Sequence, residues 1–128
     1  MLIVEDDEQT REMYTAWLTF SGFRVAGAKN GSEAIDKARR LMPDIITTDI
    51  GLTGGMDGCQ LTESLKSYAQ TTKIPVIAVT AWAMGGHLER ARKAGCDAVL
   101  VKPCLPETLL AEIQRLLKIH PPRSRSRK

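Results

Sequence analysis

The chain has 128 residues, of which 43% are hydrophobic and 26% are charged, so its length and composition fit one soluble globular domain. This composition excludes disorder over the whole chain, and no apolar run approaches the roughly 20 residues of a membrane-spanning helix. The three cysteines form no Cys-x-x-Cys pair, which argues against a zinc site or a disulfide framework and favours a reducing, cytoplasmic setting.

The net charge of +3 is unevenly distributed along the chain. Residues 119–128 contain four basic side chains and no acidic one, so that residues 1–118 hold 14 basic against 15 acidic residues. A segment rich in proline, serine and arginine cannot bury enough apolar surface to fold. We therefore expect one domain over 1–118 and a basic, disordered tail over 119–128, and we expect nucleic-acid contact, if any, through the tail alone.

Strand and helix patterns alternate in the first half of the chain. In chain order we expect a strand at 2–4, a helix at 8–21, a weak strand at 23–26, a helix at 32–42 and a buried strand at 44–48. Gly22 follows the first helix, where a left-handed residue is favoured. Ser32 is a suitable cap for the second helix, which we expect to stop before Pro43.

The second half of the chain continues the alternation. A glycine-rich loop at 51–58 precedes a helix marked by Leu61, Leu65 and Tyr68, a strand at 75–79, a short helix ended by Gly95, a strand at 98–101 and a last helix from Pro106. Five strands that alternate with five helices require right-handed crossovers between parallel strands. The sequence thus predicts an α/β domain with a parallel sheet covered on both faces.

Polar side chains of complementary chemistry follow four of the expected strands. They are Glu5, Asp6 and Asp7 after the first, Asp49 after the third, Thr80 after the fourth and Lys102 after the fifth. In an open parallel sheet, ligands bind outside the carboxyl ends of the strands. We therefore expect three aspartates, a hydroxyl and an ammonium to converge at one edge. Asp44 and Asp57 are interpreted as a strand-entry residue and a helix cap.

Crowded carboxylates of this kind indicate a cation. Because they repel one another and raise each other's pKa values, they need a positive partner, and hard oxygen ligands favour Mg²⁺. A divalent ion beside Asp49 would let this carboxylate attack phosphorus without repelling the incoming anion. Lys102 and Thr80 would then hold phosphoryl oxygens by charge and by a hydrogen bond. The chemistry implied is a transient aspartyl phosphate.

The polar segments together resemble the receiver domain of two-component response regulators, in particular single-domain chemotaxis-type regulators. The resemblance runs from Leu2 to about Leu117 and rests on Glu5-Asp6-Asp7, Thr47-Thr48-Asp49, Met56-Asp57-Gly58, Val79-Thr80-Ala81, Ala94-Gly95-Cys96-Asp97 and Val101-Lys102-Pro103. It implies a flavodoxin-like fold with strand order 2-1-3-4-5. It also implies a signalling switch, not an enzyme, that takes its phosphoryl group from a sensor histidine kinase or a histidine phosphotransfer protein.

The resemblance assigns roles to individual residues. Asp49 is the expected phosphoacceptor, and the expected Mg²⁺ ligands are Asp6, Asp7, Asp49 and the backbone carbonyl of Gly51. Thr80 and Lys102 are expected to bind the phosphoryl group, with a cis peptide between Lys102 and Pro103. Phosphorylation would change the surface of the fourth helix, fifth strand and fifth helix, where a downstream protein target binds.

Three features depart from the family pattern. The loop after Asp49 has one residue more than is common in the family, and Thr53 stands where a proline is common. Val99 replaces the aromatic residue usually found three residues before the lysine, and Trp82 lies two residues after Thr80. We expect Val99 and Trp82 to modulate the switch, Trp82 by controlling the access of water to the phosphoryl group.

Other functions fit the sequence less well. The chain is alternatively a receiver fragment of a hybrid histidine kinase or of a multidomain regulator. Phosphatases with an aspartate nucleophile carry Asp-x-Asp-x-Thr, and Gly51 stands where their second aspartate acts as the acid. In a nucleotide-binding domain, the acidic residues after the first strand would repel a pyrophosphate.

Overall fold

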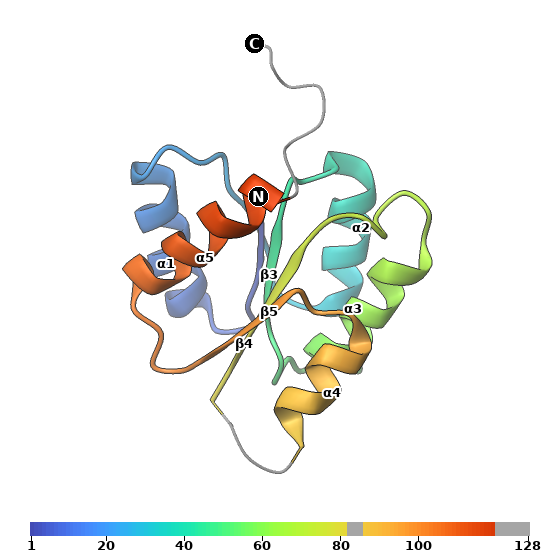
Figure 1. The fold of residues 1–128 in the computed structure, drawn as a ribbon. Helices are drawn as coiled ribbons and strands as arrows, with labels where there is room; N and C mark the ends of the chain where they lie inside the picture. The colour runs from blue at the N-terminus through green and yellow to red at the C-terminus, as the bar shows by residue number, and fades with distance from the viewer. Residues whose placement is uncertain (82–85, 120–128) are drawn as a thin grey trace.

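The computed structural model of the protein describes residues 1–81 and 86–119. Its five strands form a single parallel sheet in the order β2-β1-β3-β4-β5 (Figure 1). The strands are β1 (Leu2–Val4), β2 (Ala26–Ala28), β3 (Ile46–Asp49), β4 (Val76–Thr80) and β5 (Ala98–Val101). This order and the alternation with helices confirm the flavodoxin-like α/β fold expected from the sequence.

Helices cover both faces of the sheet. They are α1 (Glu8–Phe20), α2 (Gly31–Leu41), α3 (Gly58–Ser67), α4 (His87–Ala94) and α5 (Pro106–Ile119). The helices α1 and α5 lie on one face, and α2, α3 and α4 lie on the other (Figure 1). In the described part of the chain, no helix combines the length and the apolar character needed to cross a membrane.

The central strands β1, β3 and β4 are buried on both faces because helices pack on both. In β1, Leu2 and Val4 belong to the core cluster beneath α2 and α3, and Ile3 belongs to the cluster beneath α1 and α5. The same alternation separates Val76 from Ile77 in β4, and both side chains are fully buried. Continuous apolar runs in the sequence therefore fill two cores at once.

Glycine permits a close approach beside the end of β3. Gly58 begins α3 directly beside this strand end, and a Cβ atom at this position would lie 2.3 Å from the backbone oxygen of Asp49. Its N–H donates to the backbone oxygen of Ile50 at 2.9 Å. Only glycine allows α3 to start this close to the residue that ends β3.

The helices differ in how their first turns are capped. Asp57 caps α3, as the sequence predicted, in a capping box with Gln60. The helix α4 is the shortest in the described part of the chain, with eight residues, and its N-cap residue Gly86 supplies no side-chain hydrogen bond. An ion pair of 2.7 Å between Arg90 Nη2 and Asp57 Oδ2 joins α4 to the start of α3.

Some local expectations differ from the structure, among them the third strand, which covers Ile46–Asp49 instead of 44–48. The second strand covers Ala26–Ala28 instead of 23–26, because Phe23 and Val25 pack into the cluster beneath α1 before the chain reaches the sheet. The second helix is capped by Asn30 instead of Ser32, and the Asn30 side chain accepts from Glu33 N–H at 2.8 Å. Of the predicted tail, Ile119 ends α5, and residues 120–128 lie outside the described residues, as does Trp82.

Candidate functional site

A lysine bridges two carboxylates at the carboxyl edge of the sheet. Glu5 directly follows β1, Asp49 is the last residue of β3, and Lys102 directly follows β5. Lys102 Nζ lies 3.2 Å from Asp49 Oδ2 and 3.5 Å from Glu5 Oε1. The parallel strands thus bring together three residues that are widely separated in the sequence.

The carboxylates of Glu5, Asp6 and Asp49 form an acidic cluster in which the three candidate ligand atoms lie within 4.8 Å of one another. Glu5 is 6% exposed. Its burial raises its pKa above the ordinary value, the charge of Asp49 raises it further, and a hydrogen bond from Asp7 N–H and the charge of Lys102 oppose the shift. Burial and the neighbouring charge of Asp49 therefore make Glu5 easier to protonate than an exposed glutamate.

Lys102 remains positively charged in this setting. Burial lowers its pKa, but attraction to Asp49 and Glu5 outweighs burial and places the pKa above its ordinary value. The peptide bond between Lys102 and Pro103 is cis. On the other side of this bond, the Tyr14 hydroxyl donates to the backbone oxygen of Cys104 at 2.9 Å and so connects α1 to the segment that carries Lys102.

Asp7 lies outside the acidic cluster, although the sequence grouped it with Asp6 as a metal ligand. Its side chain caps α1 and accepts from Thr10 N–H at 2.9 Å and from the Thr10 hydroxyl. These two hydrogen bonds lower the pKa of Asp7. Because α1 begins at Glu8, directly after Asp7, the Asp7 carboxylate is held at the helix start. Glu5, instead of Asp7, joins Asp6 and Asp49 in the acidic cluster.

The remaining predicted site residues lie around the same edge. Gly51 N–H donates to Asp49 Oδ1 at 3.1 Å, so that both oxygens of Asp49 have a partner. Thr80 ends β4 and is 3% exposed, and its backbone oxygen accepts from Lys102 N–H at 2.7 Å. Thr80 therefore sits at the strand end next to the lysine, as the sequence predicted.

Val99 belongs to the core beneath α3 and α4. It pairs with Ala78 across β4 and β5 and is half-buried against the cluster that includes Ala78, Ile50 and Ala91. The modulating role predicted for Val99 remains a prediction, and Trp82, its predicted partner in that role, lies outside the described residues.

Sequence reasoning missed Thr53. Its backbone N–H and its hydroxyl both donate to Asp6 Oδ2, at 3.2 Å and 3.0 Å. Loop residues have no periodicity that would indicate their partners. The only signal in the sequence was that Thr53 stands where the family commonly has a proline.

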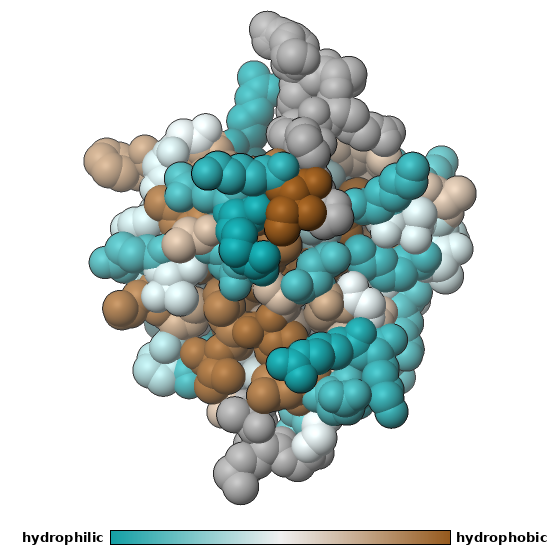
Figure 2. Space-filling view, viewed as in Figure 1, coloured by the Kyte–Doolittle hydropathy of each residue, from teal (hydrophilic) through white to brown (hydrophobic). Residues whose placement is uncertain are grey.

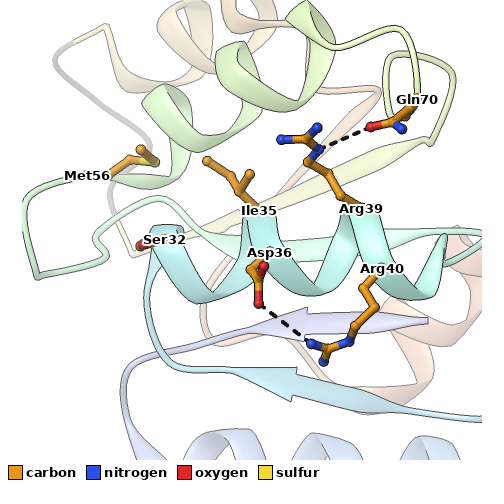
Figure 3. Close-up of a pocket in the computed structure, with 7 residues that line it drawn as sticks. All are labelled: Ser32, Ile35, Asp36, Arg39, Arg40, Met56 and Gln70. Carbon is orange, nitrogen blue, oxygen red and sulfur yellow. Dashed lines mark hydrogen bonds and ion pairs between the residues drawn. The ribbon is translucent and has the colours of Figure 1, made fainter.

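A groove of about 480 Å³ lies along α2, apart from the acidic cluster (Figure 3). Its polar side chains contact one another, since Arg39 donates to Gln70 at 3.1 Å and Arg40 lies 3.6 Å from Asp36. Met56, from the loop after β3, lines one end of the groove. The groove therefore lies between α2, the loop after β3 and the segment after α3 that carries Gln70.

Comparison with known proteins gives the family of the chain. Residues 1–114 match the family described as the response regulator receiver domain. The chain belongs to this family. A relative of this receiver domain, the polar-differentiation response regulator DivK of Brucella anthropi, is 42% identical over 103 residues, which cover 80% of this chain and 83% of DivK.

Solved structures extend the similarity of the receiver domain to its whole fold. The signal receiver domain of a signal transduction histidine kinase from Syntrophus aciditrophicus superimposes with a TM-score of 0.87 at 31% identity and covers 99% of this chain and 95% of its own. The Vibrio cholerae chemotaxis protein CheY4 gives a TM-score of 0.85 at 30% identity, with coverage of 91% and 96%. This receiver domain is thus similar both to a chemotaxis protein and to the receiver of a histidine kinase.

Proposed function

We propose that this receiver domain accepts a phosphoryl group on Asp49 and acts as a phosphorylation-dependent signalling switch. The observation that carries the proposal is the position of Lys102, 3.2 Å from Asp49 and 3.5 Å from Glu5 at the edge where β1, β3 and β5 end. A carboxylate beside a fixed ammonium is a suitable nucleophile toward an anionic phosphoryl group, because the ammonium offsets the repulsion between the two.

The proposed reaction transfers the phosphoryl group from a phosphohistidine. An oxygen of Asp49 attacks phosphorus, the phosphorus–nitrogen bond breaks, and the imidazole leaves with the electron pair of that bond. The product is an acyl phosphate on Asp49. Lys102 and the Thr80 hydroxyl would hold the phosphoryl oxygens. Thr80 ends β4, which lies next to β3, and Lys102 follows β5, which lies next to β4.

Mg²⁺ is the cofactor that fits the acidic cluster. Carboxylate oxygens of Glu5, Asp6 and Asp49 lie within 4.8 Å of one another, and hard oxygen donors at this density suit Mg²⁺. These three residues would hold the ion together with the backbone carbonyl of Gly51, and Glu5 takes the place first expected for Asp7. When bound, Mg²⁺ neutralises charge on the carboxylates and on the phosphoryl oxygens.

The partners follow from this chemistry. The donor is a sensor histidine kinase or a histidine phosphotransfer protein in the cytoplasm. For output we propose the surface of α4, β5 and α5, where Val101 is 43% and Leu105 is 62% exposed. Figure 2 shows hydrophobic side chains gathered on this face of the molecule, around β5 and the start of α5. A surface of this character suits a protein target.

Mass spectrometry of the intact chain tests the proposal. With phosphoramidate and Mg²⁺, we expect one added phosphoryl group on the wild type and on Asp36→Asn, a control on the exposed side of α2. Asp49→Asn should gain none. Undiminished labelling of Asp49→Asn, or a wild type that stays unlabelled while it is folded, would overturn the proposal.

A further inference from the structure

We propose that Thr53 is a positioning residue for the metal site: its two hydrogen bonds orient the Asp6 carboxylate for Mg²⁺ binding. This inference rests on the Mg²⁺ site proposed above and adds to it a residue outside the ligand set. It comes from the loop after β3, where the chain departs from the common pattern of its family.

Two donors of Thr53 converge on one oxygen of Asp6. The backbone N–H lies 3.2 Å and the hydroxyl 3.0 Å from Asp6 Oδ2. A carboxylate that accepts two hydrogen bonds on one oxygen is fixed in rotation and still has a second oxygen for a cation. Asp6 also belongs to the acidic cluster with Glu5 and Asp49. Thr53 therefore acts on a side chain that the cation must reach.

The loop itself is held in place on both sides of Thr53. Leu52 is 7% exposed and packs into the core beneath α2 and α3. After Thr53 the chain turns through Gly54 and Gly55, with φ values of 88° and 96° in the left-handed region, where glycine is favoured. Met56 then packs over Gly31 at the start of α2 and lines the groove in Figure 3.

These contacts hold the two donor groups of Thr53 in place. A buried leucine and a packed methionine flank the turn, so the position of Thr53 does not depend on Asp6 alone. A proline at position 53 would supply neither donor, because it has no N–H and no hydroxyl. The threonine thus provides the acidic cluster with two donors that the common family residue lacks.

Groups that hydrogen-bond to metal ligands set the orientation of those ligands, and their loss commonly reduces metal affinity by 10- to 100-fold. Thr53 is exposed, and its backbone N–H remains in any side-chain variant other than proline, so we expect the lower end of that range. Thr53→Val should raise the Mg²⁺ concentration for half-saturation about tenfold. Thr53→Ser keeps the hydroxyl and should restore most of the affinity.

The chain offers a matched control. Thr10 makes the same pair of hydrogen bonds, from its backbone N–H and its hydroxyl, to Oδ2 of Asp7. Asp7 lies outside the acidic cluster. Thr10→Val therefore removes the same hydroxyl from the neighbouring aspartate, and we expect it to leave the affinity for Mg²⁺ unchanged.

The experiment titrates MgCl₂ into the full chain by isothermal calorimetry and repeats the titration with labelling by phosphoramidate. We expect Thr53→Val to need about tenfold more Mg²⁺ and to reach the wild-type labelling rate at saturation, with rescue in Thr53→Ser. Thr53→Val with wild-type affinity, or Thr10→Val with an equal loss, overturns the role of Thr53. A wild type that binds no Mg²⁺, or an Asp49→Asn variant that binds Mg²⁺ with wild-type affinity, instead overturns the proposed metal site.

Discussion

Removal of the Asp49 charge is expected to stabilise the metal-free domain. Asp49 lies within 4.8 Å of two other carboxylates and 3.2 Å from the ammonium of Lys102. At an effective dielectric constant of about 20, each repulsion costs about 3 kcal/mol and the attraction contributes about 5 kcal/mol. The balance is a net repulsion, which solvent screening at this partly exposed edge reduces to about 1 kcal/mol.

The variant Asp49→Asn removes this charge with little change of shape. Lys102 keeps a second carboxylate, because Glu5 lies 3.5 Å away. In a chelator-treated sample at pH 7, we expect the melting temperature to rise by about 3–5 °C, the shift that about 1 kcal/mol produces in a domain of this size. Circular dichroism on heating measures it directly.

Mg²⁺ should reverse the order of the two proteins. A cation that binds the folded state raises the melting temperature of the wild type by mass action, and Asp49→Asn lacks one of the ligands. The matched variant is Asp7→Asn, which removes an equal charge next to the acidic cluster and keeps an oxygen to cap α1. Its metal-free melting temperature should not rise, because the hydrogen bonds from Thr10 favour the charged form of Asp7 in the folded state.

A fall in the metal-free melting temperature of Asp49→Asn would refute this reasoning, because it would mean that the pair with Lys102 outweighs the repulsion. A rise in Asp7→Asn as large as that expected for Asp49→Asn would return Asp7 to the acidic cluster. Either result would require a different distribution of charge at this edge.

Three further predictions concern other contacts. Burial raises the pKa of Asp57, but hydrogen bonds from Gln60 N–H and Arg90 outweigh burial and hold the pKa below its ordinary value. The stability that this provides is present at neutral pH and is lost as the pH falls below about 4, so the free energy of unfolding in urea should depend less on pH in Asp57→Asn than in the wild type. Tyr14→Phe removes the hydrogen bond to Cys104 and should lower the free energy of unfolding by about 1 kcal/mol in urea, whereas an unchanged midpoint would show that the bond contributes nothing. Beryllofluoride stands in for the phosphoryl group, and with Mg²⁺ it should change tryptophan fluorescence in the wild type and in Trp17→Phe but not in Trp82→Phe. A fluorescence change that is lost only in Trp17→Phe would place the response in α1.

Much of the fold follows from the sequence because β1, β4 and β5 are largely apolar and most helices have a recognisable end. Pro106 does begin α5, and Gly95, with φ of 108°, does end α4. The cap of α2 was harder to assign, because Asn30 and Ser32 are both good caps. Glu33 decides between them, since its carboxylate reaches back to Lys29 N–H at 2.7 Å while its own N–H donates to Asn30.

The candidate site shows where reasoning from sequence stops. Three consecutive acidic residues follow β1, and their order alone does not tell which two lie near Asp49, although the predicted helix start at residue 8 already favours Asp7 as the cap. The start of α1 decides the matter, because a helix that begins at Glu8 takes Asp7 as its cap. Thr53 was not predicted as a partner of Asp6, because a hydrogen bond across 47 positions depends on how the loop folds over α2.

The helix α4 has too little local support to be as stable as its neighbours. Eight residues are fewer than an isolated helix needs to be stable in water. The N-cap residue of α4 is Gly86, which has no side chain to accept a hydrogen bond from the first turn. Its attachment depends on the buried Ala91 and Ala94 and on the pair between Arg90 and Asp57. Among the described helices we therefore expect α4 to open first by local unfolding, with backbone amides that exchange with solvent faster than those of α3. If phosphorylation rearranges α4, we expect it to work against this local opening free energy alone, while the core clusters beneath α1, α2 and α5 stay closed.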